Sequence, residues 1–151
     1  MTTPENVRPI KQTLRLTAPL VEQITLDEAR LHLRVTADDD SPPHHPDDLL
    51  ILALISSARD YCENNLMRAL APQTVTVTLD AFPTGAIQLP MSPIDSVTSI
   101  KYTDTNNIEQ TLSSAVYVVD SYQEPGWVLP ATGQSWPATA DTINAVRIQY
   151  E

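Results

Sequence analysis

The pattern of apolar and polar positions changes its period once along the chain, near residue 72. Before that point apolar residues recur every three to four positions, and after it they alternate with polar ones. The first spacing is typical of amphipathic helices and the second of half-buried strands. Because the helices precede the strands, the pattern predicts an α+β fold, with an N-terminal helix pair followed by an antiparallel β-rich module.

Two segments carry the helical spacing. In ITLDEARLHLRV, Thr25 and Glu28 form a capping-box pattern, so we expect a two-turn helix that ends near Arg34. The longer segment is PDDLLILALISSARDYCENNLMRAL, where Pro46 suits the first turn and Pro72 is expected to mark the end. This longer segment is the strongest predicted element of the chain.

The long helix is apolar on almost all sides over its first two turns. One stripe consists of Ile51, Ile55, Ala58 and Cys62, a second of Leu50, Leu54 and Tyr61, and Leu49 and Leu52 widen the arc. An ordinary surface helix has a single apolar face. This helix therefore needs cover on two sides, either from its own domain or from a neighbouring subunit. Cys62, the only cysteine, is expected to be a buried small hydrophobic residue.

Seven later segments have the period of strands, at 74–79, 86–90, 96–102, 108–112, 115–120, 126–130 and 145–150. Between two of them, TDTNN predicts a hairpin turn, with Asn106 and Asn107 able to take positive φ. The ribbon from Ser96 to Asp120 places small polar side chains outward, which favours an assembly surface. Trp136, just before a proline, is interpreted as the anchor of a polar loop and not as a platform for stacking a ligand.

Composition divides the chain into an extended arm, a helical region and a β-rich module, at residues 1–23, 24–71 and 72–151. The arm holds three prolines and is more basic than the rest of the chain. Its segment TLRLTA could form one short strand. Arms of this composition are often ordered only against a partner. The N-terminus has no apolar core segment, so we expect no signal peptide, and no apolar run is long enough for a membrane span.

The net charge is −10, with two lysines in the whole chain. This charge argues against a protein that wraps nucleic acid, which needs a basic face. It suits a surface past which DNA slides, although acidity also serves solubility alone. The sequence holds no nucleotide-binding, nucleophile-elbow or zinc-protease motif. We therefore expect no enzyme and no cofactor.

Metal-ligating residue types gather in one loop, TADDDSPPHHPDD, at residues 36–48. Adjacent histidines flanked by prolines rarely face one ion together, and the loop lacks the glycine and the terminal glutamate of a calcium loop. We interpret it as a solvated loop whose acidic residues favour the start of the long helix. A metal-dependent hydrolase built on this loop remains an alternative.

Three stretches together resemble the phage head–tail connector, or adaptor, family, in its gp6-like and phiE125 gp8-type members. The first is ITLDEARLHLRV with the acidic loop and LLILALISSARDYCENNLMRAL. The others are LDAFPTGAIQLPMSPIDSVTSIKYTDTNNIEQTLSSAVYVVD, and PGWVLPATGQSWPAT with NAVRIQY. The most specific segments are L-P-x-x-P-I-x-S-V-T-S-I-x-Y and G-x-S-W-P. The resemblance covers residues 20–151.

The resemblance implies a virion protein without catalytic residues, which forms a homo-oligomeric ring below the portal protein. The ring would extend the channel for genomic DNA, without sequence-specific binding, and dock the tail or further neck proteins. Many members continue past the equivalent of VRIQY into helices that pack on the N-terminal pair. Without such helices, helix 49–66 would need its second cover from a neighbour or the portal.

Contacts with other subunits or with the portal are expected at Arg8, Lys11, Arg15, Leu50, Leu54, Tyr61 and Trp136. The arm could reach an acidic neighbour through its basic side chains. The remaining alternative is a tail-completion or minor capsid protein with similar α+β construction but a different position in the particle.

Overall fold

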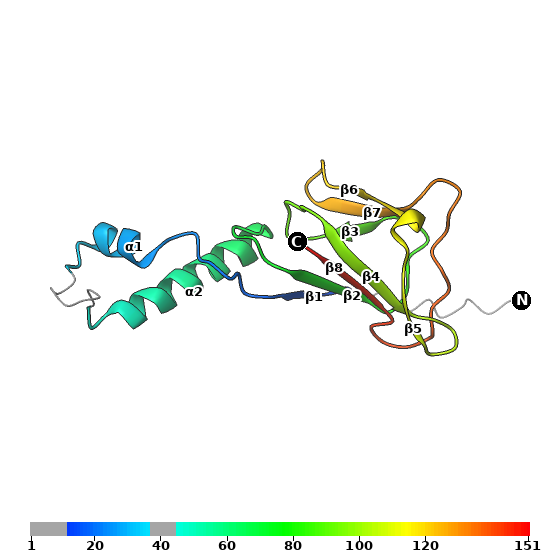
Figure 1. The fold of residues 1–151 in the computed structure, drawn as a ribbon, viewed down its shortest axis with the longest axis horizontal. Helices are drawn as coiled ribbons and strands as arrows, with labels where there is room; N and C mark the ends of the chain where they lie inside the picture. The colour runs from blue at the N-terminus through cyan, green and yellow to red at the C-terminus, as the bar shows by residue number, and fades with distance from the viewer. Residues whose placement is uncertain (1–11, 37–44) are drawn as a thin grey trace, which may run out of the picture. The chain divides into compact units, whose positions relative to one another are not determined.

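A computed structural model describes residues 12–36 and 45–151. The chain forms two compact units, one of residues 18–73 and one that combines the described residues up to Thr17 with residues 74–151. The first unit is helical and the second is built from strands (Figure 1). The predicted α+β fold is therefore confirmed. The three-part division of the chain at residues 23 and 71 remains a prediction.

The helical unit contains α1 (Leu26–Leu33) and α2 (Asp48–Leu66). The predicted capping box is present, because the Glu28 backbone N–H donates to Thr25 Oγ1 at 3.2 Å and the Thr25 N–H donates to the Glu28 carboxylate at 2.8 Å. The chain leaves α2 at Met67, whose φ of 51° is left-handed. This end agrees with the helix expected at residues 49–66, and Pro72 follows Met67 by five residues.

The β unit consists of two antiparallel sheets (Figure 1). The five-stranded sheet has the order β1-β2-β8-β4-β5, with the bounds Gln12–Leu16, Val75–Leu79, Val146–Tyr150, Val97–Thr103 and Glu109–Thr111. The three-stranded sheet has the order β3-β7-β6, with the bounds Ile87–Leu89, Gly126–Pro130 and Tyr117–Asp120. A 3₁₀ turn, η1, precedes β6 at Ser114–Val116. All seven predicted strands are present, and the short strand suggested within the arm is β1.

The main hydrophobic core lies in the β unit. Along β2 the burial alternates, so that Val75, Val77 and Leu79 are buried while the threonines between them are half-buried. This is the pattern that a period of two predicts for a strand with one face in the core. The Tyr150 hydroxyl at the end of β8 donates to the Pro90 carbonyl. Burial raises the pKa of this tyrosine, which therefore stays a neutral donor.

Close packing in the β unit makes one glycine necessary. A Cβ on Gly126, at the start of β7, would lie 2.4 Å from Ile94 Cδ1 and 3.1 Å from the Asp120 carbonyl oxygen. Real Cβ atoms essentially never approach another atom as closely as the first distance. A larger residue at position 126 would therefore require the end of the Ile94 side chain to move.

The predicted hairpin turn joins β4 to β5. Asn107 has a φ of 61°, as predicted, but Asn106 does not take positive φ. Instead the Asn106 N–H donates to Asp104 Oδ1 at 2.8 Å, and the Ile108 N–H donates to the same oxygen at 3.0 Å. The Ile108 N–H, the Gln110 side-chain amide at 2.9 Å from Asp104 Oδ2, and the Asn106 N–H together hold the pKa of Asp104 below its ordinary value.

Only part of the polar ribbon from Ser96 to Asp120 lies at the edge of a β-sheet. Its first strand, β4, lies inside the five-stranded sheet between β8 and β5. The strands that end a sheet are β5 and β6 within the ribbon, together with β1 and β3. An assembly surface formed by strand edges of this ribbon would therefore use β5 or β6 and not β4.

Candidate functional site

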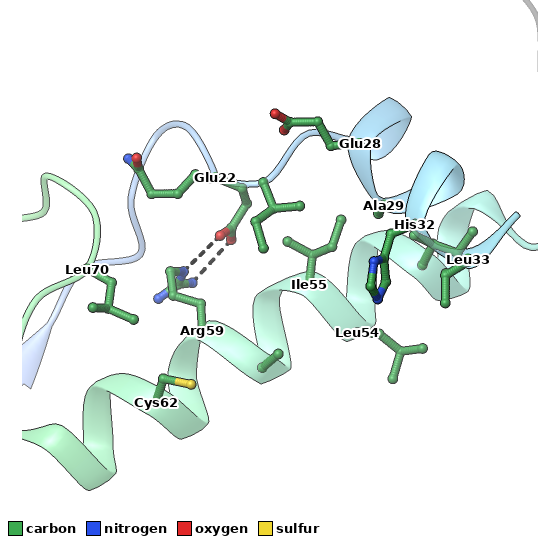
Figure 2. Close-up of a pocket in the computed structure, with 14 residues that line it drawn as sticks. Glu22, Glu28, Ala29, His32, Leu33, Leu54, Ile55, Arg59, Cys62 and Leu70 are labelled. Carbon is green, nitrogen blue, oxygen red and sulfur yellow. Dashed lines mark hydrogen bonds and ion pairs between the residues drawn. The ribbon is translucent and has the colours of Figure 1, made fainter.

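The helical unit contains an apolar groove between α1 and α2, with a volume of about 600 Å³ (Figure 2). The segment before α1 and Leu70 after α2 complete its walls. Its apolar lining includes Leu33, Ile51, Leu54, Ile55, Ala58 and Cys62. The two helices are therefore not packed to the density of a closed core, which leaves no void of this size.

The first apolar stripe of α2 explains the position of the groove. All four of its residues line the groove, because the spacing of three to four residues places them on one side of the helix. Ile51 at the start of the stripe is buried, whereas Cys62 near its end is exposed. The expectation that Cys62 is buried was therefore wrong. Its side of the helix meets an open groove and not a packed core.

The second stripe of α2 remains exposed to solvent. The exposed fractions are 58% for Leu50, 56% for Leu54 and 71% for Tyr61. Within α2 only Ile51 and Glu63 are buried. The helix thus carries the surplus of apolar surface that its sequence indicates, and the described part of the chain does not cover it.

Charged residues hold the helical unit together where apolar packing is incomplete. Arg59 of α2 donates to both carboxylate oxygens of Glu22, at 2.9 and 3.2 Å (Figure 2), and to Glu63 at 2.8 Å. The hydrogen bonds to Glu22 raise the pKa of the Arg59 guanidinium. Glu63 is 1% exposed and also accepts from the Leu70 N–H at 2.8 Å and from Gln73 Nε2 at 2.6 Å. This cluster ties the segments before α1 and after α2 to the long helix.

A second ion pair joins the two helices directly. Arg30, the one buried residue of α1, donates through Nε to Asp48 Oδ1 at 2.8 Å and through Nη2 to Asp48 Oδ2. The backbone N–H of His45 also donates to Asp48 Oδ2, at 2.7 Å. The fork of hydrogen bonds from Arg30 holds the pKa of Asp48 below its ordinary value. Asp48 thus lies in the first turn of α2, as predicted, and pairs with α1.

Of the residues predicted to contact other subunits or the portal, the structure places only some close together. Leu50, Leu54 and Tyr61 lie on one helix, while Arg8 and Lys11 lie outside the described residues. Arg15 is in β1 and pairs in register with Thr76. That these residues make contacts with other subunits or the portal remains a prediction.

Trp136 belongs to the β unit and anchors its loop, as predicted. Its indole Nε1–H donates to the Gly85 carbonyl at 2.8 Å. Its ring stacks on Phe82 with centroids 4.9 Å apart and 5° between the planes. Phe82 lies 54 positions earlier in the sequence, so periodicity alone did not reveal this partner.

Most of the acidic loop, residues 37–44, lies outside the described residues. Of its described members, Asp48 is engaged by Arg30. In residues 12–36 and 45–151, no three His, Cys, Asp or Glu side chains are grouped as ligands of a metal ion. Over the same ranges, no helix has the length and apolar character to cross a membrane.

The fold and the groove define an α+β protein whose helical unit leaves an apolar groove and an exposed apolar stripe on α2. Residues 23–126 match the model of the phage gp6-like head–tail connector protein family. Since this match covers more than half of the 151 residues, the chain belongs to that family. The resemblance seen in the sequence is thereby confirmed. Head–tail connectors are virion components, so the chain is a phage virion protein of the connector class. No curated protein matches the sequence.

Solved structures with a similar fold come from particles of a gene transfer agent (GTA). A chain in the neck of the empty GTA particle, computed with C6 symmetry, superposes with a TM-score of 0.73 at 21% identity, and the match covers 91% of this chain and 69% of that chain. A chain of the native GTA virion gives a TM-score of 0.71 at 21% identity, with the same coverage. The neck of the native particle computed with C12 symmetry gives 0.58 at 20% identity, covering 91% and 68%. At this level of identity the likeness concerns the fold.

Proposed function

We propose that the protein is a structural connector that forms a ring below the portal of a tailed phage, extends the DNA channel and docks the tail or further neck proteins. The observation that carries this proposal is the exposed second stripe of α2. Three large side chains on one side of a helix are each more than half exposed. A soluble protein rarely leaves a contiguous apolar surface of this kind uncovered unless it serves an interaction.

Family membership and symmetry support the assembly as a ring. The similar folds lie in particle necks computed with C6 and C12 symmetry. A chain repeated around such an axis contacts its neighbours through two different surfaces, and a ring results when the rotation closes. The exposed apolar side chains of the helical unit could form these contacts between subunits.

The charge of the chain supports a role as a DNA conduit. With a net charge of −10, the protein repels the phosphate backbone overall, so DNA would pass without adhering. The arm of residues 1–23 is the exception, because it holds Arg8, Lys11 and Arg15 against two glutamates, Glu5 and Glu22. We propose that it contacts an acidic surface of the portal or of a neighbouring subunit.

The test is Leu54→Asp, examined by assembly in phage particles and by the folding of the purified chain. Because Leu54 is 56% exposed, the isolated variant should fold with native circular dichroism, yet it should be absent from the particle neck, where the added charge would be buried at several kcal/mol. Thr105→Asp, on the exposed β4–β5 turn, is the matched control and should assemble normally. Normal incorporation of Leu54→Asp would contradict the proposal.

Two further measurements separate the alternatives. Cross-linking in purified particles distinguishes a connector, which must contact the portal, from a tail-completion or minor capsid protein, which would not. Metal analysis of protein purified without a histidine tag tests the alternative that the chain is a metal-dependent hydrolase. Stoichiometric zinc or manganese would contradict the structural role.

A further inference from the structure

We propose that the first eleven residues of one chain dock onto the outer face of the three-stranded sheet of a neighbouring copy. This inference rests on the proposed ring, and it names the acidic surface that the basic arm would contact there. The segment of residues 1–11, the arm tip, joins β1 at Gln12. The surface that receives it, the outer face, consists of Val118, Asp120, Trp127 and Leu129.

The outer face is the side of the three-stranded sheet that is turned away from the hydrophobic core (Figure 1). The residues on either side of Trp127 in β7 are buried, whereas Trp127 is half-buried and Leu129 is exposed. Val118 of β6 pairs in register with Leu129, and Asp120 pairs with Trp127. The exposed fractions of Val118 and Leu129 are 53% and 38%. An exposed aliphatic pair beside a tryptophan is typical of a contact surface.

The charge around the outer face selects a basic partner. Residues 69–100 and 102–146, which include the whole three-stranded sheet, hold no Lys or Arg. Asp120 lies on the outer face itself, and Glu124 lies in the turn that joins β6 to β7. A partner that brings both apolar and basic side chains therefore complements this face.

The outer side of the five-stranded sheet has a different charge. Lys101 and Arg147, the only basic residues within residues 74–151, are register partners on β4 and β8. Glu109 Oε1 lies 3.2 Å from Lys101 Nζ, and Glu109 Oε2 lies 3.8 Å from Arg147 Nη1. Two cations thus share one carboxylate, and this side would repel a basic segment. The arm tip can therefore distinguish the two sheets.

The arm tip has the composition that the outer face requires. Its sequence, MTTPENVRPIK, places Arg8 and Lys11 on either side of Pro9 and Ile10. Segments with proline lose little conformational entropy when they bind in an extended form, and they commonly dock on exposed aromatic rings. Pro9 and Ile10 would pack against the apolar side chains of the outer face, while the two flanking cations approach its carboxylates.

The place where the arm tip is attached favours the outer face of a neighbour. Gln12 pairs with Leu79, at the end of β2. The β6–β7 turn lies toward the start of β2, because β7 begins beside the end of β3, and the next residue, Pro90, accepts from Tyr150 opposite Val75. To reach its own outer face, the arm tip would have to turn back along the β unit. Eleven residues reach about 36 Å when extended, which is enough to join adjacent subunits.

Disulfide trapping in assembled particles tests the contact, because the single native cysteine can be removed. In a Cys62→Ser background, Ile10→Cys and Val118→Cys place one thiol on the arm tip and one on the outer face. Mild oxidation of purified particles should join neighbouring chains into a ladder of dimers, trimers and larger species. The matched control combines Ile10→Cys with Thr111→Cys, which is exposed on the edge strand β5, and it should give no ladder.

The products of oxidation decide between the outcomes. A disulfide closed within single chains would place the arm tip on its own sheet and contradict the inference. A ladder with Thr111→Cys, or no ladder with either variant, would overturn the inference alone if the chain is present in the neck. Absence of the chain from the neck would overturn the proposed function as well.

Peptide binding tests the same contact in solution. The receptor is the full chain with Arg8→Glu and Lys11→Glu, so that its own arm tip does not compete, and the probe is a fluorescein-labelled peptide of residues 1–11. The peptide should bind at low salt and dissociate as the salt concentration rises, since opposite charges form part of the contact. Val118→Lys in the receptor should weaken binding at least about tenfold by repulsion. Thr111→Lys adds the same charge to an edge strand of the other sheet and should have little effect.

A conservative variant isolates the contribution of charge. Asp120→Asn keeps an acceptor oxygen for the Tyr122 N–H, which donates to Asp120 Oδ1 at 3.1 Å, but removes the negative charge. It should weaken peptide binding severalfold and make the binding less dependent on salt. No binding of the peptide at low salt, or equal binding to the Val118→Lys and Thr111→Lys receptors, would contradict the outer face as the docking site.

Discussion

Glu63 shows how a single residue organises the helical unit. Its carboxylate is almost fully buried, yet it accepts hydrogen bonds from a guanidinium, a side-chain amide and a backbone N–H. A buried carboxylate without such partners would cost several kcal/mol. Through the Leu70 N–H, Glu63 also fixes the segment that leaves α2, which lines one end of the groove.

Replacing Glu63 should destabilise the helical unit strongly. Glu63→Ala leaves the Leu70 N–H, Gln73 and part of Arg59 without their partner, so we expect a loss of about 3 kcal/mol in the free energy of unfolding. Chemical denaturation followed by the helical circular dichroism signal measures this loss. Glu63→Gln is the matched control, because it keeps an acceptor oxygen and should lose about half as much. Equal, small losses in both variants would show that the cluster is not what holds the unit.

For single side chains, the sequence predicts only contacts between residues that are close together in the sequence. Arg59 and Glu63 are four positions apart on a helix, a spacing that indicates a side-chain pair. The third member, Glu22, lies 37 positions from Arg59 and precedes α1. No local rule relates such distant positions, so the burial of Glu63 could not be predicted.

At the scale of elements, α1 and α2 are joined by the pair of Arg30 and Asp48 more than by apolar packing. Both side chains are largely buried, with exposed fractions of 10% and 15%. Leu31 and Leu33, the apolar residues at the end of α1, are mostly exposed. The position of α1 therefore depends on an ion pair, and this makes it sensitive to pH.

We expect α1 to loosen from α2 in acid. Because the native pKa of Asp48 is depressed, the pair contributes its full stability above the ordinary pKa of about 3.9 and loses it as the pH falls further toward the native pKa. Hydrogen exchange of the α1 amides between pH 5 and pH 2 measures the loosening. The hydrogen bonds from Thr25 also lower the pKa of Glu28, in the first turn of α1.

The variant Asp48→Asn distinguishes the contribution of Asp48 to the acid response of α1 from that of Glu28. In this variant α1 should exchange faster already at pH 5, and the remaining change with acid should be smaller, since the Arg30–Asp48 ion pair no longer contributes. An acid response identical to that of the wild-type chain would show that the Arg30 pair does not position α1.

The elements themselves were largely predictable, because their signals are local. The capping box of Thr25 and Glu28 set the start of α1, and alternation located every strand of the two sheets. The end of α2 at Leu66 agrees with the expected helix 49–66, although Met67 adopts a left-handed conformation without being Gly or Asn. Non-local packing decides such a conformation, and no residue type signals it.

For the whole molecule, the two units differ in how well they bury apolar residues. The β unit has a continuous core from Val75 to Tyr150, whereas α2 buries one apolar residue. The composition of α2 predicted this surplus of apolar surface. It did not predict that α1 would leave a groove beside the first stripe, since the depth of packing between two helices depends on side chains from both.

The central claim is that neighbouring chains cover α2 in the native particle. The most direct measurement is a high-resolution reconstruction of the intact neck of the phage that carries this protein. We predict that Leu50, Leu54 and Tyr61 lie against another protein chain, with their exposed fractions reduced to near zero. A reconstruction in which these side chains face solvent, with no chain against α2, would contradict the account.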